Sequence, residues 1–405
     1  MKILYYNHTG QASGAEYLLL MVLARLDRNT FEPIVVCPHQ GPLARMVEEL
    51  KVPVEIVQGL EARFTSQGAL LFRYLRSFIQ VIRGLRKRVV TIKPDLIHAN
   101  SIRAGLVASA ATIGLRTKVV WHLHDLLPRH PISSLVRVCA FLAPRARMIA
   151  VSQAVATNFT GGISPLKKRI QVILNGIDLD KFQGSRSAGQ EIRREFQLDE
   201  SAVVFGIVGQ LTPRKGQLEL IRAFAKVLQR TPAATLLVVG SALFNRDEDY
   251  ETLLKQTASD LGIVDRVLFT GSRKDVPAVM QAMDVLIVNS TIEPFGLVAL
   301  EAMACGTPVL AAVSGGIPEL IEHGKNGWLV PQGDESALTN AMLHLAPRPA
   351  ACSLLAKEAR LQMLSRFSAE EYLRQIQDFY HHTAGRAATV YEDRVVRPTE
   401  TARVA

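Results

Sequence analysis

The stretch VGQLTPRKG, residues 208–216, joins an apolar run to a segment with helical periodicity. A strand followed by a glycine-bearing loop and a helix start leaves unpaired N–H groups and the positive end of the helix dipole pointing outward. Arg214 and Lys215 add two cations at that place. We therefore predict that Gly209–Gly216 binds a diphosphate without a metal; the alternative is an ordinary turn with surface charges.

Short apolar runs rich in Val, Ile and Leu alternate with helical patterns on both sides of this stretch. Runs that are apolar throughout are typical of strands buried on both faces, so the pattern predicts an α/β, doubly wound fold with parallel sheets. The expected strands are Lys2–Tyr6, Ile34–Cys37, Asp95–Ala99, Lys118–Leu123 and Met148–Val151, and then Val203–Val208, Thr235–Val239, Arg266–Phe269, Val285–Val288 and Pro308–Ala311.

The length of 405 residues favours two domains, because single cores rarely grow beyond about 250–300 residues. The strong turn signal in VILNGID, residues 172–178, and the polar stretch Gly184–Glu191 predict the hinge. A capping box, Ser368 with Glu371, predicts the start of a late helix. The predicted parts are domains over 1–174 and 175–366, a helix over 367–384 and a disordered tail over 385–405.

The composition is that of a globular protein, with 48% hydrophobic and 21% charged residues. The cysteines are scattered without a C-x-x-C pair, which favours a reducing cytoplasm over a disulfide framework or zinc site. We expect no signal peptide and no spanning helix. The net charge of +10 is compatible with nucleic acid and also with nucleotide diphosphates beside anionic lipid, and charge alone does not distinguish these partners. We expect no nucleic-acid partner.

Residues 68–93 combine an apolar stripe with surrounding arginines and lysines, and contain no acid. This is the pattern of a basic amphipathic helix, which can lie on an anionic membrane surface. A helix packed on a core shows the same stripe, so both interpretations stay open. The stripe consists of Leu71, Leu75, Phe78, Ile82, Leu85 and Val89.

Two glutamates stand eight residues apart in the second half. Glu293-Pro-Phe-Gly leads into the expected helix Leu297–Cys305, which contains Glu301 and has Gly306 at its C-cap. Glu293 would lie in the loop at a strand's carboxyl end, which is the edge where open α/β sheets bind ligands. Both acids can then reach one crevice, whereas the alternative is plain surface charge on a helix.

Other polar segments follow expected strands or turns. The loop His8–Glu16 is shaped for backbone N–H groups to meet an anion, but it lacks G-x-G-x-x-G and gives no support for a dinucleotide site. Gly315–Glu319 and Gly324–Gly327 are further glycine turns. His122 and His124 alternate to the same face beside Asp125; this is a poor metal set, so we expect no metal site.

Together these segments resemble the signature blocks of retaining glycosyltransferases of family 4. The likeness covers nearly the whole chain and is most specific over residues 203–331. It implies the GT-B fold, with two Rossmann-like domains facing a central cleft and a C-terminal helix crossing back to the first domain. The blocks are Val208–Gly216, Glu293–Glu301 (EPFGLVALE), Ala304–Val309 (ACGTPV), Gly315–Glu319 (GGIPE) and Asn326-Gly327.

The resemblance also implies roles for individual residues. Lys215 would contact the donor diphosphate, Glu301 the nucleotide ribose and Glu293 the donor sugar. Gly14 in Ser13-Gly-Ala-Glu16 would lend a backbone amide to the phosphate, and His124 would lie near the anomeric carbon. The implied catalytic residues are Glu293, His124 and Lys215, and further donor contacts fall at Gln210, Arg214, Gly216, Phe295, Gly296 and Leu297.

One position departs from the family. Its members commonly carry arginine where this chain has Gln210, which weakens the diphosphate clamp unless Arg214 substitutes. The resemblance implies an enzyme that moves a hexosyl group from a nucleotide diphosphate-sugar to a glycan, lipid-linked or small-molecule acceptor, without a metal and with retention.

Such an enzyme would serve polysaccharide biosynthesis in the cytoplasm, with residues 68–93 able to hold it on the inner face of the membrane. The alternatives are a non-catalytic sugar-nucleotide-binding or membrane-docking subunit and a GT-B sugar-nucleotide epimerase.

Overall fold

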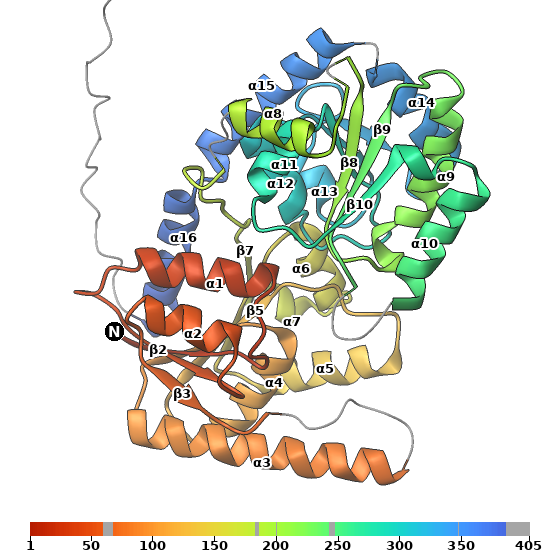
Figure 1. Ribbon diagram of the computed structural model, residues 1–405. Helices are drawn as coiled ribbons and strands as arrows, with labels where there is room; N and C mark the ends of the chain where they lie inside the picture. The colour runs from red at the N-terminus through yellow and green to blue at the C-terminus, as the bar shows by residue number, and fades with distance from the viewer. Residues whose placement is uncertain (60–67, 183–185, 200, 243–247, 347, 386–405) are drawn as a thin grey trace, which may run out of the picture.

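The computed structural model contains two α/β halves, one above the other, joined near the middle of the chain (Figure 1). It describes residues 1–405 apart from 60–67, 183–185, 200, 243–247, 347 and 386–405. The predicted tail therefore lies almost wholly outside the described residues. Within them, no helix is long and apolar enough to cross a membrane.

The first half is built on a parallel sheet of seven described strands. Their order in space is β3-β2-β1-β4-β5-β6-β7. The strands are β1 (Lys2–Tyr6), β2 (Glu32–Cys37), β3 (Val54–Ile56), β4 (Leu96–Ala99), β5 (Lys118–Leu123), β6 (Ala146–Ala150) and β7 (Ile170–Val172). Helices α1 (Gly14–Arg25), α2 (Pro42–Glu49), α3 (Gly68–Ile92), α4 (Ile102–Ala111), α5 (Pro131–Leu142), α6 (Gln153–Thr160) and α7 (Ser164–Lys167) connect them.

The second half repeats the design with six described parallel strands in the order β10-β9-β8-β11-β12-β13. These are β8 (Val204–Val208), β9 (Thr235–Val239), β10 (Val267–Gly271), β11 (Val285–Val288), β12 (Val309–Ala312) and β13 (Trp328–Val330). The helices are α8 (Arg186–Glu195), α9 (Gln217–Leu228), α10 (Glu248–Asp260), α11 (Val276–Ala282), α12 (Leu297–Cys305), α13 (Ile317–Leu320), α14 (Glu335–Leu345) and α15 (Pro349–Arg366). The doubly wound parallel sheets confirm the predicted fold class.

Each sheet reverses its strand order once, between β1 and β4 in the first half and between β8 and β11 in the second. Ligands of open α/β sheets bind outside the carboxyl ends of the strands at such reversals. We therefore expect a ligand-binding crevice at the reversal in each half. The loops after β1 and β4 border it in the first half, and the loops after β8 and β11 border it in the second.

The last helix, α16 (Ala369–Ala384), returns to the first half as the family resemblance implied. Tyr372, Ile376 and Tyr380 are buried together with residues of β1 and α1. Ser368 caps the helix by accepting a hydrogen bond from the Glu371 N–H, at 3.2 Å. Only this half of the predicted capping box forms, because the Glu371 carboxylate is engaged by Arg374 and Gln375.

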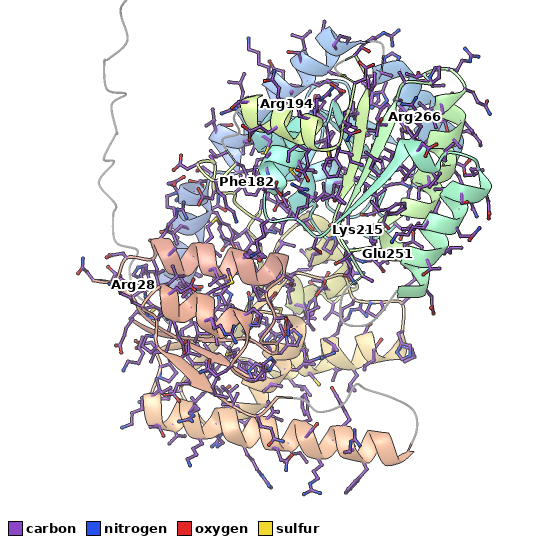
Figure 2. The ribbon with its side chains drawn as sticks, viewed as in Figure 1. Arg28, Phe182, Arg194, Lys215, Glu251 and Arg266 are labelled. Atoms are coloured by element: carbon purple, nitrogen blue, oxygen red, sulfur yellow. The ribbon has the colours of Figure 1, made fainter. Side chains whose placement is uncertain are left out.

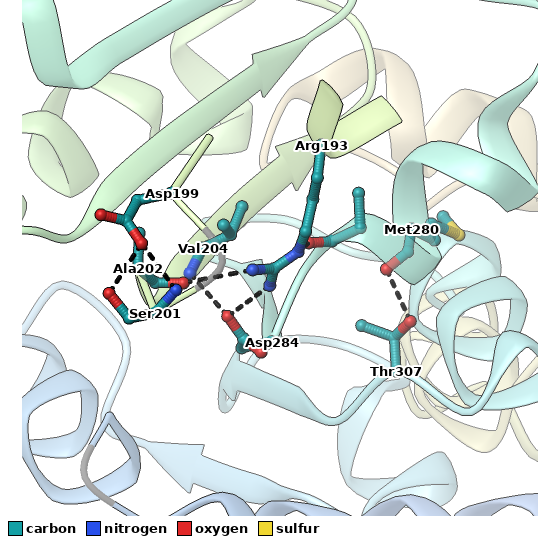
Figure 3. Close-up of polar contacts among 9 residues, drawn as sticks. Arg193, Asp199, Ser201, Ala202, Val204, Met280, Asp284 and Thr307 are labelled. Carbon is teal, nitrogen blue, oxygen red and sulfur yellow. Dashed lines mark hydrogen bonds and ion pairs between the residues drawn. The ribbon is translucent and has the colours of Figure 1, made fainter. Parts of the chain in front are cut away.

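The segment expected to be the polar hinge contains the start of helix α8. From Arg186 onward the chain is helical, and the helix is anchored to the second sheet by Arg193 (Figure 3). This guanidinium donates to the Ala282 carbonyl at 2.9 Å and to the Asp284 carboxylate at 2.8 Å, which in turn accepts from the Val204 N–H. Residues 186–191 of the predicted hinge segment are thus the first turns of α8.

Helix α3 uses most of its predicted stripe for the core. Leu85 and Val89 are buried, and Phe78 and Ile82 pack against the same cluster. Leu75 is half exposed, and the side chain of Leu71 lies outside the described residues. Four of the six stripe residues therefore pack on the core, while Leu75 and other apolar side chains of α3 are exposed.

Candidate active site

The loop after β8 is a tight cradle. Pro213–Lys215 form a 3-10 turn, and Gly216 follows at φ +71° before helix α9 begins. A Cβ atom on Gly216 would lie 2.2 Å from the Asn289 carbonyl oxygen, so only glycine fits here. Asn289 at the end of β11 in turn donates its side-chain amide to the Gly216 carbonyl at 2.9 Å. The loop is thereby locked against the neighbouring strand at the sheet reversal.

Lys215 and Glu293 form an ion pair across this cradle. The Lys215 Nζ atom lies 2.7 Å from Glu293 Oε2, and both side chains are largely buried. The Ser290 hydroxyl donates to the same carboxylate oxygen at 2.9 Å. Figure 2 shows Lys215 on the side of the second half that faces the first half. The structure thus brings together the residues for which the resemblance implied diphosphate and sugar contacts.

Glu301 lies one turn into helix α12, whose N-cap is Gly296 at φ +107°. Burial raises the pKa of its carboxyl group to about 7, although nearby Lys181 and Lys215 lower it. No hydrogen-bond partner within the described part of the chain engages this carboxylate. An acid held in a half-buried place without a partner, close to two cations, is suited to accept hydroxyl groups of a ligand.

The first half contributes the start of helix α1. Gly14 opens this helix and faces Leu297, the first residue of α12, because a Cβ atom on Gly14 would lie 3.0 Å from the leucine Cδ1. The start of α1 is fixed by Glu16, which accepts a hydrogen bond from the Ser13 N–H at 3.0 Å. Two helix N-termini from different halves therefore meet at one place, and both favour anions.

His124 belongs to a directed chain of buried hydrogen bonds. Its Nε2 atom lies 3.1 Å from Asn100 Oδ1, and the Asn100 amide donates to Asn7 Oδ1 at 3.1 Å. The Asn7 amide then donates to Glu16 Oε1 at 3.2 Å. Since Asn100 presents its oxygen, His124 Nε2 carries a proton and Nδ1 is the acceptor. Burial lowers the pKa of His124 to about 3, so the imidazole is neutral at neutral pH.

A second row of side chains lies behind His124. The rings of His122 and His124 lie 4.0 Å apart between centroids with their planes tilted by 39°, and His122 Nδ1 lies 3.2 Å from His98 Nε2. The hydroxyl of Tyr380 on helix α16 lies 2.7 Å from the other nitrogen of His98. The returning helix therefore supports the wall of the cleft that carries His124. Sequence reasoning placed the two histidines on one face but did not identify His98 or Tyr380 as their neighbours.

Arg214 lies in the same loop as Gln210, and its contacts are with other segments. Its guanidinium donates to the Ile292 carbonyl at 3.1 Å, and it is close enough to Asp125 of the first half to lower the pKa of that carboxyl group. Burial nevertheless raises the pKa of Asp125 overall. The Gln210 carbonyl accepts from the Gln217 side chain at 2.9 Å. Arg214 is thus an exposed cation at the mouth of the site.

The remaining donor contacts named by the resemblance are backbone positions in this geometry. Phe295 is buried and packs against Phe367 with 6.4 Å between ring centroids, so its side chain belongs to the core. A Cβ atom on Gly296 would lie 2.6 Å from the Ile317 Cδ1 atom. Only the main chain of these two residues, at the start of α12, is available to a ligand.

Glu319 joins the two halves and was not recognised as a site residue from the sequence. Its carboxylate accepts hydrogen bonds from the N–H groups of Gln153 at 2.8 Å and Ala154 at 2.9 Å, and so caps helix α6 of the first half. Beside it, the Ser152 hydroxyl donates to the Pro294 carbonyl at 2.6 Å. The GGIPE segment, interpreted as a turn, therefore carries an interdomain contact next to Glu293.

Among the described residues, no group of three or more histidines, cysteines or acids is arranged to hold a metal ion. The cationic groups around the cradle are Lys215, Arg214 and Lys181. An anionic ligand at this site would therefore contact fixed positive charges and helix N-termini.

Comparison with known protein families gives matches to both halves. Residues 12–181 match the model described as Glycosyltransferase Family 4, and residues 189–362 match the model described as Glycosyl transferases group 1. A D-inositol 3-phosphate glycosyltransferase of Salinispora arenicola is 36% identical over 388 residues, covering 88% of this chain and 84% of the relative. An N-acetyl-alpha-D-glucosaminyl L-malate synthase of Bacillus anthracis is 30% identical over 71% of this chain and 74% of its own length.

The fold comparison agrees. The crystal structure of Anabaena Alr3699/HepE in complex with UDP-glucose superposes with a TM-score of 0.81 at 32% sequence identity, covering 94% of this chain and 100% of that chain. A sucrose-phosphate synthase from Thermosynechococcus elongatus shares the fold with a TM-score of 0.77 at 22% identity. The chain therefore belongs to glycosyltransferase family 4 and is a nucleotide-sugar-dependent transferase with the GT-B fold.

Proposed function

We propose that this enzyme transfers a hexosyl group from a UDP-sugar to an acceptor hydroxyl, with retention of anomeric configuration and without a metal ion. The observation that carries the proposal is the Lys215–Glu293 pair, which stands at the sheet reversal between two helix N-termini. The UDP-glucose complex of the Anabaena protein supports uridine as the base.

In this proposal the reaction breaks the bond between the anomeric carbon and the diphosphate oxygen and forms a bond to the acceptor oxygen. Lys215 and the N–H groups at Gly14 and at the start of α12 stabilise the negative charge that develops on the diphosphate. Glu293 binds the sugar hydroxyls and Glu301 the ribose. The acceptor attacks on the face that the diphosphate leaves, and its proton passes to a diphosphate oxygen, which gives retention.

His124 is assigned to the sugar side of the cleft. A neutral imidazole whose Nε2–H is held by Asn100 offers an acceptor nitrogen to a donor-sugar or acceptor hydroxyl. Because the imidazole does not ionise at neutral pH, it adds no positive charge near the anomeric carbon, where positive charge develops. This environment favours an orienting role over that of a general acid.

A thermal-shift screen followed by a transfer assay tests the proposal. A bound donor at a hundred times its dissociation constant should stabilise the enzyme by ~2.7 kcal/mol. We expect stabilisation by UDP-sugars and not by GDP- or ADP-sugars, and transfer that persists with a chelator present. Binding of a UDP-sugar without hydrolysis or transfer would instead favour the non-catalytic subunit, and interconversion of free UDP-sugars would favour the epimerase.

We also propose that the enzyme works on an anionic membrane surface in the cytoplasm, in polysaccharide biosynthesis. Helix α3 presents exposed Phe72, Leu75 and Ile79 next to exposed Arg73 and Arg76, which supports shallow membrane contact. Sedimentation with anionic liposomes should weaken as salt is raised. Equal sedimentation with neutral liposomes would contradict the proposal.

A further inference from the structure

A groove of about 460 Å³ lies in the first half, between helices α3, α4 and α5 and away from the residues assigned to the donor. We call it the α3–α5 groove. Helix α5 contributes a single face over its whole length, with the spacing of one side of a helix. The residues from α5 are Ile132, Leu135, Val136, Cys139 and Leu142.

The α3–α5 groove is lined mainly by apolar side chains, with Ser109, Thr112 and Arg145 as its polar members. Tyr74, Leu75 and Phe78 come from α3, while Leu106 and Ala110 come from α4. The floor is Trp121, whose indole N–H is already satisfied by the Ser109 hydroxyl at 2.9 Å. Most of the groove surface therefore favours contact with hydrocarbon rather than hydrogen bonds with a ligand.

Large apolar side chains are also exposed around the mouth of the groove. These side chains belong to all three helices or to the loops that follow them. Single apolar side chains scattered over a surface are common and need no explanation, whereas a cluster does. A contiguous exposed apolar rim on a globular protein marks a contact with lipid, ligand or protein. The exposed apolar residues that line the groove are Leu75, Ile113, Leu135 and Leu142, and Phe72 is exposed nearly one turn before Leu75 on α3.

The direction of the groove follows from the topology. Helices α4 and α5 come after β4 and β5, so both begin at the carboxyl edge of the sheet, where the donor cleft lies. Asn100 and Ser101 immediately precede α4, and His124 and Asp125 lie in the connection to α5. The groove therefore leads from the cleft edge outward for the length of α5, roughly 18 Å for its 12 residues.

The positive charge around the groove favours a lipid with an anionic headgroup. Between residues 68 and 147 the sequence has 14 lysines and arginines but only two acids, Asp95 and Asp125. Arg103 stands in the first turn of α4, and Arg129 lies two residues before α5, so the topology puts both near the helix ends that face the cleft. Arg145 lines the groove itself. This excess of positive charge complements a phosphate or diphosphate at the end of the groove nearest the cleft.

We propose that the α3–α5 groove binds the hydrocarbon chain of a lipid-linked acceptor, whose anionic phosphate headgroup lies at the cleft edge near Arg103 and Arg129. The inference rests on the proposed transfer function, because it names the acceptor class for that reaction. It places the hydroxyl to be glycosylated beside His124, while the chain runs away from the donor toward the exposed rim.

The test uses Cys139, which lines the groove and is exposed, whereas Cys37, Cys305 and Cys352 are buried. The rate of Cys139 alkylation by a small neutral iodoacetamide is measured with butyl, octyl or dodecyl phosphate below its micelle-forming concentration. We expect protection whose half-saturating concentration falls by about fourfold per added methylene until the groove is filled. Inorganic phosphate should give no protection, and protection independent of chain length would overturn the proposal.

Matched variants locate the site. Leu135→Gln changes a side chain on the rim that is 60% exposed, and Leu354→Gln changes one on α15 that is 67% exposed, so neither disturbs a core. Leu135→Gln should weaken protection by dodecyl phosphate about tenfold, and Leu354→Gln should leave it unchanged. Equal effects of the two variants would overturn the proposal. Because the readout is binding, absence of sugar transfer would refute the proposed function without touching this result.

The chain's own C-terminal segment is the competing occupant. Helix α16 ends near the groove, since a Cβ atom on Gly385 would lie 3.8 Å from Lys118 Nζ, next to the groove residue Val119. The alkylation experiment is therefore repeated on a chain that stops at Gly385. If Cys139 without any lipid reacts several times faster in the shortened chain, the tail and not a lipid is the natural occupant, and the proposal is wrong. Unchanged reactivity supports it.

Discussion

The Lys215 ammonium and the Glu293 carboxylate form an ion pair at 2.7 Å. In the proposed function the cation binds the donor diphosphate and the acid binds the donor sugar, so donor binding exchanges this contact for contacts with the donor. Part of the binding energy is then spent on separating the pair. Removing the positive charge and removing the negative charge should therefore have different effects on UDP binding and on sugar transfer.

Glu293→Gln should leave affinity for bare UDP unchanged or improve it, because Lys215 is released from its partner. Sugar transfer should fall about a hundredfold or more, the scale of losing a transition-state contact. Lys215→Ala should instead weaken UDP binding and slow transfer together. Calorimetry with UDP and a turnover assay on both variants separate these outcomes. Normal transfer by Glu293→Gln, or a severe loss of UDP binding, would show that the role assignment is wrong.

The raised pKa of Glu301 predicts a pH dependence of nucleotide binding. With a pKa of about 7, the carboxyl group in the free enzyme becomes ionised as the pH rises through neutrality. A ribose hydroxyl binds the ionised form better, so UDP affinity should increase with pH from 6 to 8, by up to about tenfold per unit below the pKa. The phosphate also titrates near pH ~6, so the variant is needed to isolate the carboxyl contribution.

The control is Glu301→Gln, which cannot ionise. It should weaken UDP and UDP-sugar alike, by ~1.5–3 kcal/mol for a hydrogen bond to a charged group. The part of the pH profile due to Glu301 should disappear. If the wild-type and Gln profiles are parallel, Glu301 does not bind the nucleotide in its ionised form.

The chain of amides behind His124 predicts a positioning effect. Asn100→Ala removes the acceptor for His124 Nε2 and leaves the Asn7 carbonyl oxygen without its donor. We expect a loss of ~1–3 kcal/mol in the free energy of unfolding and a lower kcat with an unchanged KM for donor. Asn29→Ala, at an exposed position, is the control. A variant with normal kcat despite the lower stability would restrict Asn100 to a structural role.

The sequence predicted most strands of both sheets, because continuous apolar runs identify strands buried on both faces. Lys2–Tyr6, Lys118–Leu123, Thr235–Val239 and Val285–Val288 agree residue for residue with β1, β5, β9 and β11. The strands β3, β7 and β13 were not predicted. Each lies at a sheet edge and has three residues, which is too short a run to show a periodic pattern, and β3 and β7 also carry a polar residue in the middle.

The site was predictable where a motif is local and not where the fold brings distant residues together. Helix α12 and its Gly306 C-cap follow the predicted bounds, and the cradle of Gly209–Gly216 lies at a sheet reversal. The pairing of Lys215 with Glu293 joins positions 78 residues apart, and no sequence period encodes such a distance. For the same reason Asn7 and Asn100, which are 93 residues apart, were missed as partners behind His124.

The position of Arg214 predicts that it does not fully replace the arginine usual at Gln210. Its guanidinium is held by the Ile292 carbonyl at the mouth of the site. Arg214→Ala should therefore reduce UDP affinity only a few times, whereas Gln210→Arg should increase it by restoring a charge in the cradle. Calorimetry on both variants measures this. A loss with Arg214→Ala as large as that of Lys215→Ala would show that compensation is complete.

The contact of Glu319 with helix α6 predicts an effect on how the two halves are held together. Glu319→Ala removes the acceptor for two N–H groups at the start of α6, a loss of ~0.5–2 kcal/mol for a helix cap. Asp334→Ala is a matched control, because Asp334 caps helix α14 within the second half by accepting from the Ala337 N–H at 2.8 Å. Both variants should lose similar stability in urea. Only Glu319→Ala should increase the radius of gyration in solution scattering, because only its cap joins the halves. Identical scattering of the two variants would mean that this contact does not control the separation of the halves.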